Sequence, residues 1–388
     1  MGFLMATILV GCAIVTGAAD RPPQFLIVSF DGAGDATELR EWTAAGDRLG
    51  ARFTFFLSGV YLLAGDQSVR YLPPQHTAGA SDIGFAIKPD DTDVRTGIRD
   101  LVAALNDADA SGYEIATHFN GHFCGRRAGA VGQWGPKDWR KELDQFEALA
   151  RGVAKNNGID AELHIQPIVG TRTPCLEGNL AFLRTVLAQR GMRYDASTAG
   201  YSELWPWRDG VWIFPVPLVA VDGESFKTLA SDYNFYLNQT GAKDVDAEQT
   251  PELAEQMYRS LRADFDARYA GDRAPMSVAF HFESWNHGAY RDALVHLLSE
   301  VCGGVEVRCT TYRDVANWLD RHGDPVAPPT LSTAGPVGAY VIGSTSTPFV
   351  RASQCTCGPV DTPLEPTDAI RSPATTRSPS STLVAERW

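Results

Sequence analysis

Short apolar segments rich in β-branched and aromatic residues alternate along the chain with stretches whose apolar residues recur every three or four positions. The first kind is typical of buried strands and the second of amphipathic helices. Alternation of this kind over roughly 300 residues predicts an α/β fold with a parallel sheet, either open or closed into a barrel. We expect the strands at Gln24–Phe30, Ala51–Ser58, Tyr113–Phe119, Ile165–Val169, Met276–Phe282 and Val305–Thr310.

Two stretches between these strands have a clear apolar helical face. In one the apolar positions run from Trp139 to Val153, and in the other from Leu253 to Phe265. A last helix is expected to begin after Thr311, because Thr311 and Asp314 have the spacing of a capping box.

Composition divides the chain into three parts. Residues 1–19 contain an uncharged apolar run followed by small residues, which predicts a signal peptide, and a lipobox at Cys12 is the alternative. Residues 22–322 contain the strand–helix alternation. Within them Tyr61–Asp91 is a long insertion between the second and third strands, and loops of that length usually have a function. Residues 323–388 are rich in Pro, Ser and Thr, which predicts a mostly disordered tail.

The charge balance limits the class of partner. The 388 residues include 47 acidic and 34 basic ones, for a net charge of −13, and no dense Lys/Arg run is present. We therefore expect no nucleic-acid partner. After the N-terminal run no apolar stretch is long enough to span a membrane, so we expect no transmembrane segment in the mature chain.

The N-terminal segment and the cysteines both suggest a protein that is secreted or lies in the cell envelope. Without Cys12, six of the seven cysteines remain, an even number that suits an oxidising compartment. Cys302 and Cys309 flank a short strand and could pair, and a bridge from Cys124 to Cys175 would join two loops. Sequence alone does not decide the pairing.

Polar side chains stand at the ends of three expected strands. Asp31 ends the first strand, His118 ends the third with His122 four residues later, and His281 ends the strand that starts at Met276. The carboxyl ends of parallel strands meet at one edge, where ligands bind. Two histidines at this spacing can bind one metal ion. Taken singly, Asp31 could instead cap the next helix and His281 could be a core imidazole.

Five short motifs, in order, resemble those of the polysaccharide deacetylases, the family-4 carbohydrate esterases that share the NodB homology domain. The resemblance covers about residues 22–322 and implies a distorted (β/α) barrel of the polysaccharide deacetylase type. Phe56–Tyr61 (F-L-S-G-V-Y) also resembles a segment of secreted bacterial relatives. The motifs are F-D-G at 30–32, H-F-N-G-H at 118–122, G-T-R-T-P at 170–174, Y-D-A-S at 194–197 and F-H at 280–281.

This resemblance implies a metal-dependent hydrolase that removes N-acetyl groups from amino sugars of a cell-wall or chitin-like polysaccharide, with peptidoglycan favoured. The implied partner is the N-acetylated glycan. The implied cofactor is a divalent metal, zinc first, with cobalt, nickel or manganese as alternatives. A catalytically impaired glycan-binding protein on the same fold is the competing hypothesis.

The resemblance also assigns roles to single residues. Asp31 is the implied general base, and Arg172 keeps it ionised through a charge pair. His281 is the implied acid that protonates the leaving amine, and Asp195 would orient it and raise its pKa.

The chain departs from the family pattern in the first motif, and in the third, where Cys175 stands in place of a common aromatic residue. The second Asp of the first motif, ordinarily the third metal ligand beside His118 and His122, is Gly32 in this chain. Asp35 is the tentative replacement, Asp31 is the alternative third ligand, and a weak or empty two-histidine site is the third reading.

Four residues are candidate contacts for the substrate. The backbone N–H near Cys175 would help to stabilise the oxyanion. Trp285 and His287 directly follow the last motif, and Trp205 could stack on a sugar ring, although tryptophans are often core residues.

Overall fold

The computed structural model describes residues 21–86, 93–201 and 204–323. The expected signal peptide with its lipobox, the last part of the insertion and the expected tail after Gly323 lie outside the described residues.

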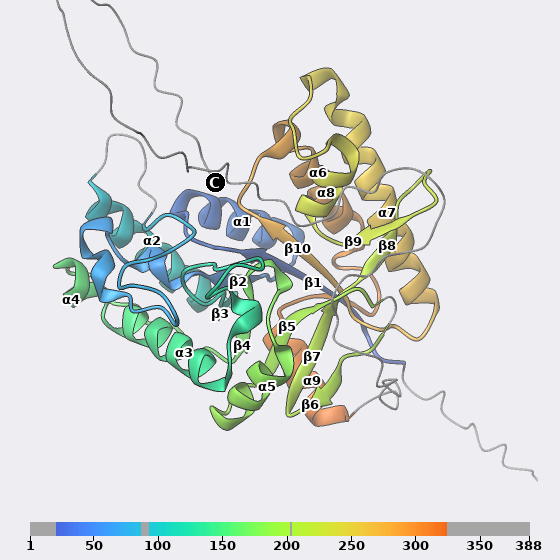
Figure 1. The fold of residues 1–388 in the computed structure, drawn as a ribbon. Coiled ribbons are helices and arrows are strands. Elements are labelled where there is room, and N and C mark those ends of the chain that lie inside the picture. The colour runs from blue at the N-terminus through green and yellow to red at the C-terminus, as the bar shows by residue number, and fades with distance from the viewer. Residues whose placement is uncertain (1–20, 87–92, 202–203, 324–388) are drawn as a thin grey trace, which may run out of the picture. The chain divides into compact units, whose positions relative to one another are not determined.

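A curled, mostly parallel sheet forms the centre of the fold (Figure 1). Its strands are β1 (Gln24–Asp31), β2 (Thr54–Leu57), β3 (Glu114–Thr117), β4 (Gly170–Thr171), β5 (Tyr194–Ala199), β6 (Trp207–Asp209), β7 (Val211–Val216), β10 (Met276–His281) and β11 (Val307–Cys309). They follow the order β10-β1-β2-β3-β4-β5-β7-β6, and β11 pairs with β1. Only the pair of β6 and β7 is antiparallel in this sheet. A separate hairpin consists of β8 (Leu218–Ala220) and β9 (Lys227–Leu229).

The sheet curls until β7 approaches β10. The Ser277 hydroxyl on β10 donates to the Pro215 carbonyl on β7 at 2.6 Å, although no ladder joins these two strands in the described chain. The fold is therefore an incomplete barrel, and this confirms the α/β class and the distorted (β/α) barrel with its insertion between the second and third strands.

Helices cover the outside of the sheet (Figure 1). None of those in the described ranges is long and apolar enough to span a membrane. They are α1 (Ala36–Leu49), α2 (Val94–Ala110), α3 (Pro136–Arg151), α4 (Val153–Asn157), α5 (Leu180–Gln189), α6 (Asp232–Thr240), α7 (Thr250–Ala270), α8 (Trp285–Val301) and α9 (Tyr312–His322), with 3-10 turns at Gly59–Leu62 (η1), Gly65–Arg70 (η2), Val131–Gln133 (η3), Pro174–Leu176 (η4) and Ala247–Gln249 (η5).

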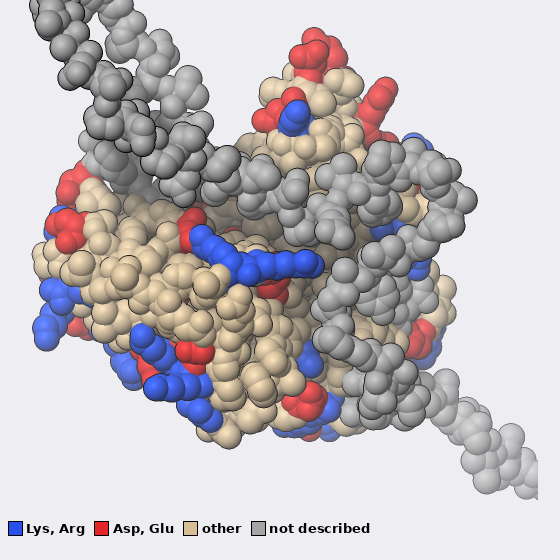
Figure 2. Space-filling model, in the orientation of Figure 1, with Lys and Arg blue, Asp and Glu red and all other residues tan. Residues whose placement is uncertain are grey.

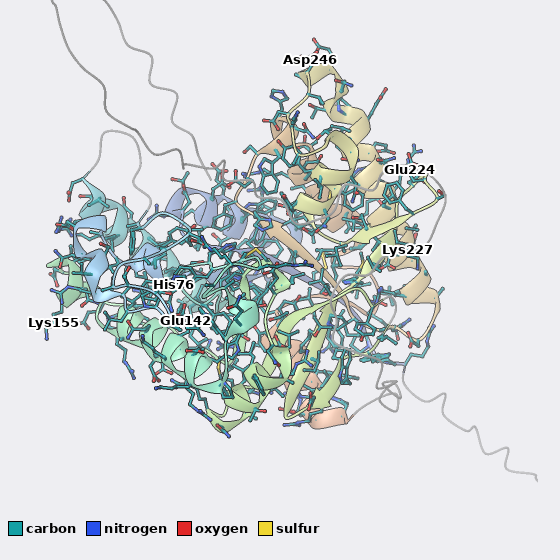
Figure 3. All side chains as sticks on the ribbon, in the orientation of Figure 1. His76, Glu142, Lys155, Glu224, Lys227 and Asp246 are labelled. Atoms are coloured by element: carbon teal, nitrogen blue, oxygen red, sulfur yellow. A yellow bond between two sulfur atoms is a disulfide. The ribbon has the colours of Figure 1, made fainter. Side chains whose placement is uncertain are left out.

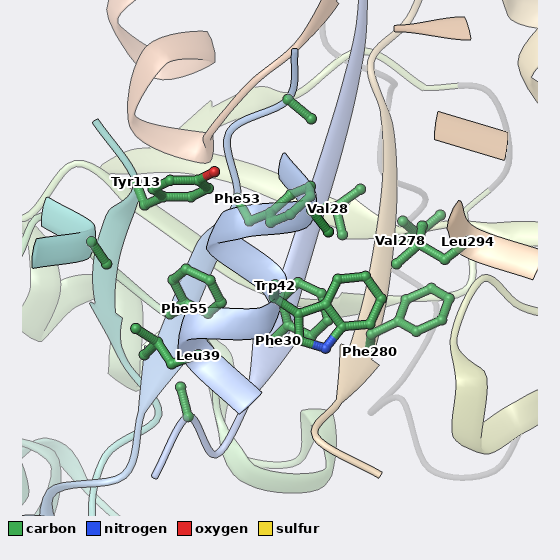
Figure 4. Close-up of a cluster of buried hydrophobic side chains, with 14 of the residues drawn as sticks. Val28, Phe30, Leu39, Trp42, Phe53, Phe55, Tyr113, Val278, Phe280 and Leu294 are labelled. Carbon is green, nitrogen blue, oxygen red and sulfur yellow. The ribbon is translucent and has the colours of Figure 1, made fainter. Parts of the chain in front are cut away.

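An aromatic core fixes the carboxyl end of β1 against α1 (Figure 4). The ring of Phe30 lies 4.5 Å from that of Trp42 on α1 and 5.5 Å from that of Phe55 on β2. Each ring of this kind removes roughly 150–250 Å² from water, so the position of this strand end is strongly determined. Asp31, the next residue, is held where the core ends.

Most of the expected elements are confirmed. Five of the six strands appear, as β1, β2, β3, β10 and β11, and α9 begins after Thr311, whose hydroxyl accepts from the Asp314 N–H at 3.2 Å. The prediction of a strand at Ile165–Val169 is wrong, because β4 starts only at Gly170. Pro167 has no N–H to give to a ladder, which explains why this segment stays irregular.

Candidate active site

The carboxyl edge of the sheet brings together four of the expected residues. Asp31 and His281 are register partners at the ends of the neighbouring parallel strands β1 and β10. His118 directly follows β3 and Arg172 directly follows β4. Parallel pairing thus places a carboxylate, two imidazoles of different strands and a guanidinium at one edge.

Arg172 is buried completely, and each nitrogen of its guanidinium donates at least one hydrogen bond. It donates to Asp31 Oδ1 at 2.9 Å, and the Phe56 ring lies 4.5 Å from its central carbon. Its other donors go to the Ser29 hydroxyl at 2.7 Å, the Tyr312 hydroxyl at 2.7 Å and the Ala196 carbonyl at 3.1 Å. A buried guanidinium held by so many partners has one orientation, so it fixes the Asp31 carboxylate in turn.

The environment of Asp31 favours its charged form. Burial by itself raises the pKa of Asp31, but the positive charge of Arg172, with further contributions from His118 and His281, holds that pKa below its ordinary value. At neutral pH the carboxylate is therefore an anion that can accept a proton.

The environment of His281 favours its protonated form, and Asp232 is the cause. His281 Nδ1 lies 2.8 Å from Asp232 Oδ1, and the His281 backbone N–H donates to Asp232 Oδ2 at 2.7 Å. Burial lowers the pKa of His281, but the charge and hydrogen bond of Asp232, with smaller contributions from Asp31 and Glu283, raise it to about 9. Because a carboxylate only accepts, Nδ1 is the donor and Nε2 is the nitrogen free to face a substrate.

The expected role of Asp195 is therefore wrong. Its carboxylate accepts from Arg184 Nε at 3.0 Å and from the Ser197 N–H at 2.9 Å, and it is completely buried on β5. Sequence reasoning missed Asp232, which follows Ser231 at the start of α6. An Asp after a Ser at a helix start is an ordinary helix-terminal pattern, so no local signal distinguishes it.

His118 and His122 are held in the form that binds metals. His118 Nδ1 lies 3.0 Å from the Arg172 carbonyl oxygen, so this nitrogen carries the proton and Nε2 has the free lone pair. The two rings are 5.4 Å apart between centroids. Burial lowers the pKa of His118 to about 3 and that of His122 to about 4, so both are neutral at neutral pH.

The side chains near these histidines are of the chemical types that bind a divalent metal ion. The carboxylate whose charge acts on both rings is that of Asp31. Asp35, the tentative third ligand, instead caps α1, where its Oδ1 accepts from the Thr37 N–H at 2.8 Å and the Glu38 N–H at 3.2 Å. Two neutral imidazoles and a carboxylate are ligands that zinc accepts. Among the described residues, however, the donor atoms that lie within 4.8 Å of one another are those of His122 and the disulfide-bonded Cys124 and Cys175, and Asp31 is not in that group.

The two cysteines beside the site form a disulfide and supply no thiolate ligand. Cys124 pairs with Cys175, which joins the loop after His122 to the loop after Arg172. Cys302 pairs with Cys309. Both pairings that the sequence suggested are present.

The candidate substrate contacts differ in how the structure places them. Trp285 is half-buried and its ring lies 5.5 Å from that of His281 and 5.1 Å from that of Tyr236, on which it is stacked. His287 is exposed, but its Nε2 is 2.9 Å from the Val245 carbonyl. Cys175 is exposed within its disulfide.

Trp205 is a core residue, and its expected place in a sugar-binding groove is wrong. Only 5% of it is exposed. Its indole stacks on Trp318 of α9 at 5.8 Å, and its Nε1 is 3.3 Å from the Asp272 carbonyl. Trp205 therefore fills the core, as tryptophans often do.

No protein-family model matches the chain, and no curated protein matches it. Solved structures with a similar fold include proteins provisionally named polysaccharide deacetylases. One from Mycobacterium smegmatis is 14% identical with a TM-score of 0.48, over 82% of this chain and 96% of that one. One from Pseudomonas aeruginosa PAO1 is 13% identical with a TM-score of 0.47, over 78% and 92% of the two chains.

A third similar structure has been described as a pseudoenzyme. It is BA3943 of Bacillus anthracis, of the CE4 family, at 10% identity and a TM-score of 0.38, over 76% of this chain and 66% of that one. At such identities and TM-scores these likenesses carry no argument about the function of this chain.

Proposed function

We propose that this chain is a metal-dependent hydrolase that removes N-acetyl groups from amino sugars of a cell-wall or chitin-like polysaccharide, with peptidoglycan favoured. It would belong to the polysaccharide deacetylases and act outside the cytoplasm or in the cell envelope. Two disulfides within the described residues support such a compartment.

One observation carries this proposal. Asp31 and His281 are neighbours in register at one sheet edge, yet Arg172 lowers the pKa of the first and Asp232 raises the pKa of the second. A pair of titratable groups whose environments push their pKa values apart is what acid–base hydrolysis requires at neutral pH.

The reaction follows from these two protonation states. Asp31 takes a proton from the water that attacks the acetamide carbonyl carbon. His281 then donates its Nε2 proton to the amide nitrogen as the C–N bond breaks, which releases acetate and a free amine. Asp232 holds the imidazole in the orientation that points Nε2 away from its own carboxylate.

His118, His122 and a carboxylate would hold the metal, zinc first, which when bound polarises the carbonyl and makes water a better nucleophile. The charge of Arg172 keeps Asp31 anionic beside those groups. The half-exposed face of Trp285, next to His281, is the surface we propose for stacking of a pyranose ring.

The test measures zinc content and acetate release on the full chain, with Asp31→Asn compared with Asp35→Asn. Asn is as good an N-cap as Asp, so the second variant keeps α1 capped and removes only the carboxylate. We expect wild type to bind about one zinc ion and to release acetate from an N-acetylated glycan. Asp31→Asn should lower the rate by about 10²–10⁴-fold, and Asp35→Asn should behave as wild type.

The outcomes separate the remaining roles. If Asp31→Asn keeps its zinc but loses activity, Asp31 is the general base. If the variant loses both zinc and activity, Asp31 is a metal ligand. If Asp35→Asn loses zinc, Asp35 is a ligand after all. The glycine at position 32 favours the competing function of a glycan-binding protein. Saturable glycan binding by a wild type that releases no acetate would establish that function and end the hydrolase proposal.

A further inference from the structure

A buried carboxylate lies directly behind the loop that joins His118 to His122. It belongs to Glu142 on α3, which is 1% exposed and is labelled in Figure 3. Burial raises the pKa of Glu142 to about 7, against hydrogen bonds from Asn120 and Tyr71 that lower it. A buried acid is costly unless its acceptors are used, so the partners of this group indicate its purpose.

The partners of Glu142 are the two residues between the histidines. Its Oε1 accepts from the Asn120 backbone N–H at 3.1 Å, and the Gly121 backbone N–H lowers the pKa of the same carboxyl group. The Asn120 side-chain amide donates in addition to the Glu142 backbone carbonyl at 3.0 Å. Glu142 thus holds both the backbone and the side chain of the loop.

The loop needs such support because its backbone is strained. Phe119 has a φ of 61° and His122 a φ of 57°, which is the left-handed region that residues with a Cβ seldom adopt. Strained conformations persist only where the surroundings over-determine them. Since His122 is itself one of the two strained residues, the conformation of the loop determines the direction of its ring.

The insertion between β2 and β3 supports the same loop from outside. The Tyr71 hydroxyl donates to the Glu142 carboxylate, at 2.8 Å from Oε1 and 3.0 Å from Oε2. The Asp82 N–H donates to the Gly121 carbonyl at 2.8 Å, and the His76 ring stacks on Phe123 at 4.0 Å. The long insertion therefore has a physical task, to back the loop between the histidines.

We propose that Glu142 is a positioning residue, whose carboxylate holds the 118–122 loop in the conformation that directs His118 and His122 to one metal ion. Tyr71 of the insertion keeps that carboxylate in place. The inference rests on the proposed function only in that a metal binds to the two histidines. Outer groups that orient metal ligands of this kind typically affect metal affinity by about 10–100-fold.

The decisive variant is Glu142→Gln, with Glu114→Gln as its matched control. Glu114 is 2% exposed and is the first residue of β3, the strand that leads to His118. Its carboxylate accepts from the Tyr194 hydroxyl at 3.0 Å and from the Arg313 N–H at 2.9 Å. Both substitutions remove a buried carboxylate that bonds a tyrosine and a backbone amide, but only one of them faces the loop. The Glu142 carboxylate accepts hydrogen bonds at both of its oxygens, and a carboxamide replaces one of them with an NH2 group that cannot accept.

Two quantities are measured on metal-free protein well below its Tm. One is zinc affinity by calorimetric titration, and the other is hydrogen exchange of the Asn120 and Gly121 amides. Glu142→Gln should weaken zinc binding by about tenfold or more and speed the exchange. Glu114→Gln should lower Tm but leave affinity within about threefold of wild type. Tyr71→Phe should change both quantities in the same direction by less.

If the folded Glu142→Gln protein binds zinc as tightly as wild type, the proposal is overturned, whatever the Tm of the variant. That result is expected of a residue that only stabilises the core. If that variant does not fold, wild-type affinity and exchange in Tyr71→Phe overturn it. If wild type itself binds no zinc, the proposed function fails. The positioning role is then tested by hydrogen exchange of the Asn120 and Gly121 amides alone. Exchange rates in Glu142→Gln that equal those of wild type overturn it.

Discussion

Asp31 and His281 occupy equivalent positions on adjacent strands and are nevertheless poised for opposite tasks. The difference lies in one neighbour each, a guanidinium 2.9 Å from the carboxylate and a carboxylate 2.8 Å from the imidazole. Electrostatic neighbours within hydrogen-bond distance outweigh burial at both residues, because burial alone would neutralise them.

The pH dependence of activity should identify which Asp controls His281. With a pKa of about 9, His281 is protonated below that pH and loses its proton above it, so the rate should fall on the alkaline side near pH 9. Asp232→Asn removes the charge that raises this pKa. We expect the alkaline limb of kcat/KM to move down by about one pH unit or more in that variant.

The control for this measurement is Asp195→Asn, since Asp195 is bonded to Arg184 and not to His281. It should leave the alkaline limb in place, even if it lowers stability. A shift of the limb in Asp195→Asn, with none in Asp232→Asn, would contradict the assignment.

Among the elements, the loops at the sheet edge contain most of the strained backbone. In the described part of the chain, ten non-glycine residues have a positive φ. Six of them lie in three segments that border the site, namely Phe119, His122, Cys175, Leu176, Asn286 and His287. Each such residue costs about 1–3 kcal/mol and needs fixed surroundings. For the second segment the fixing element is a covalent bond, from Cys175 to Cys124.

Removing the two disulfides separately should therefore have unequal effects. The Cys124–Cys175 bond spans 51 residues and the Cys302–Cys309 bond spans 7. Loop-closure entropy predicts losses of about 4 and about 2 kcal/mol in the free energy of unfolding when each pair is changed to alanine.

Urea unfolding of the two double-alanine variants measures this difference. Cys302→Ala/Cys309→Ala is the control, because its disulfide lies away from the motifs. Equal losses, or a larger loss in this control, would show that the disulfide beside the site does not act through chain entropy.

For the whole molecule, sheet, cores and site all lie between residues 21 and 323. The last described element, α9, ends at His322. We expect a chain that ends at Pro328 to keep its activity within about twofold and its Tm within about 2 °C. Thermal unfolding measures the Tm, and acetate release measures the activity. A drop in Tm beyond about 5 °C would contradict this prediction.

The sequence determined the parts of this protein that depend on local pattern. The apolar periods of the strands and the capping pair at Thr311 and Asp314 correspond to observed elements. The sequence also predicted that Asp31, His118 and His281 lie together at strand ends, because parallel strands align their carboxyl ends. The hydrophobic effect acts on such patterns before any long-range contact is specified.

Only the tertiary structure decided which charged groups meet. Asp232 reaches His281 across 49 positions, and Glu142 reaches Asn120 across 22. Asp195 lies in a motif yet faces Arg184, and Trp205 lies in the core. Hydrogen bonds and ion pairs act over a few ångströms and follow no sequence period, so the curl of the sheet, and not the spacing of residues, selects their partners.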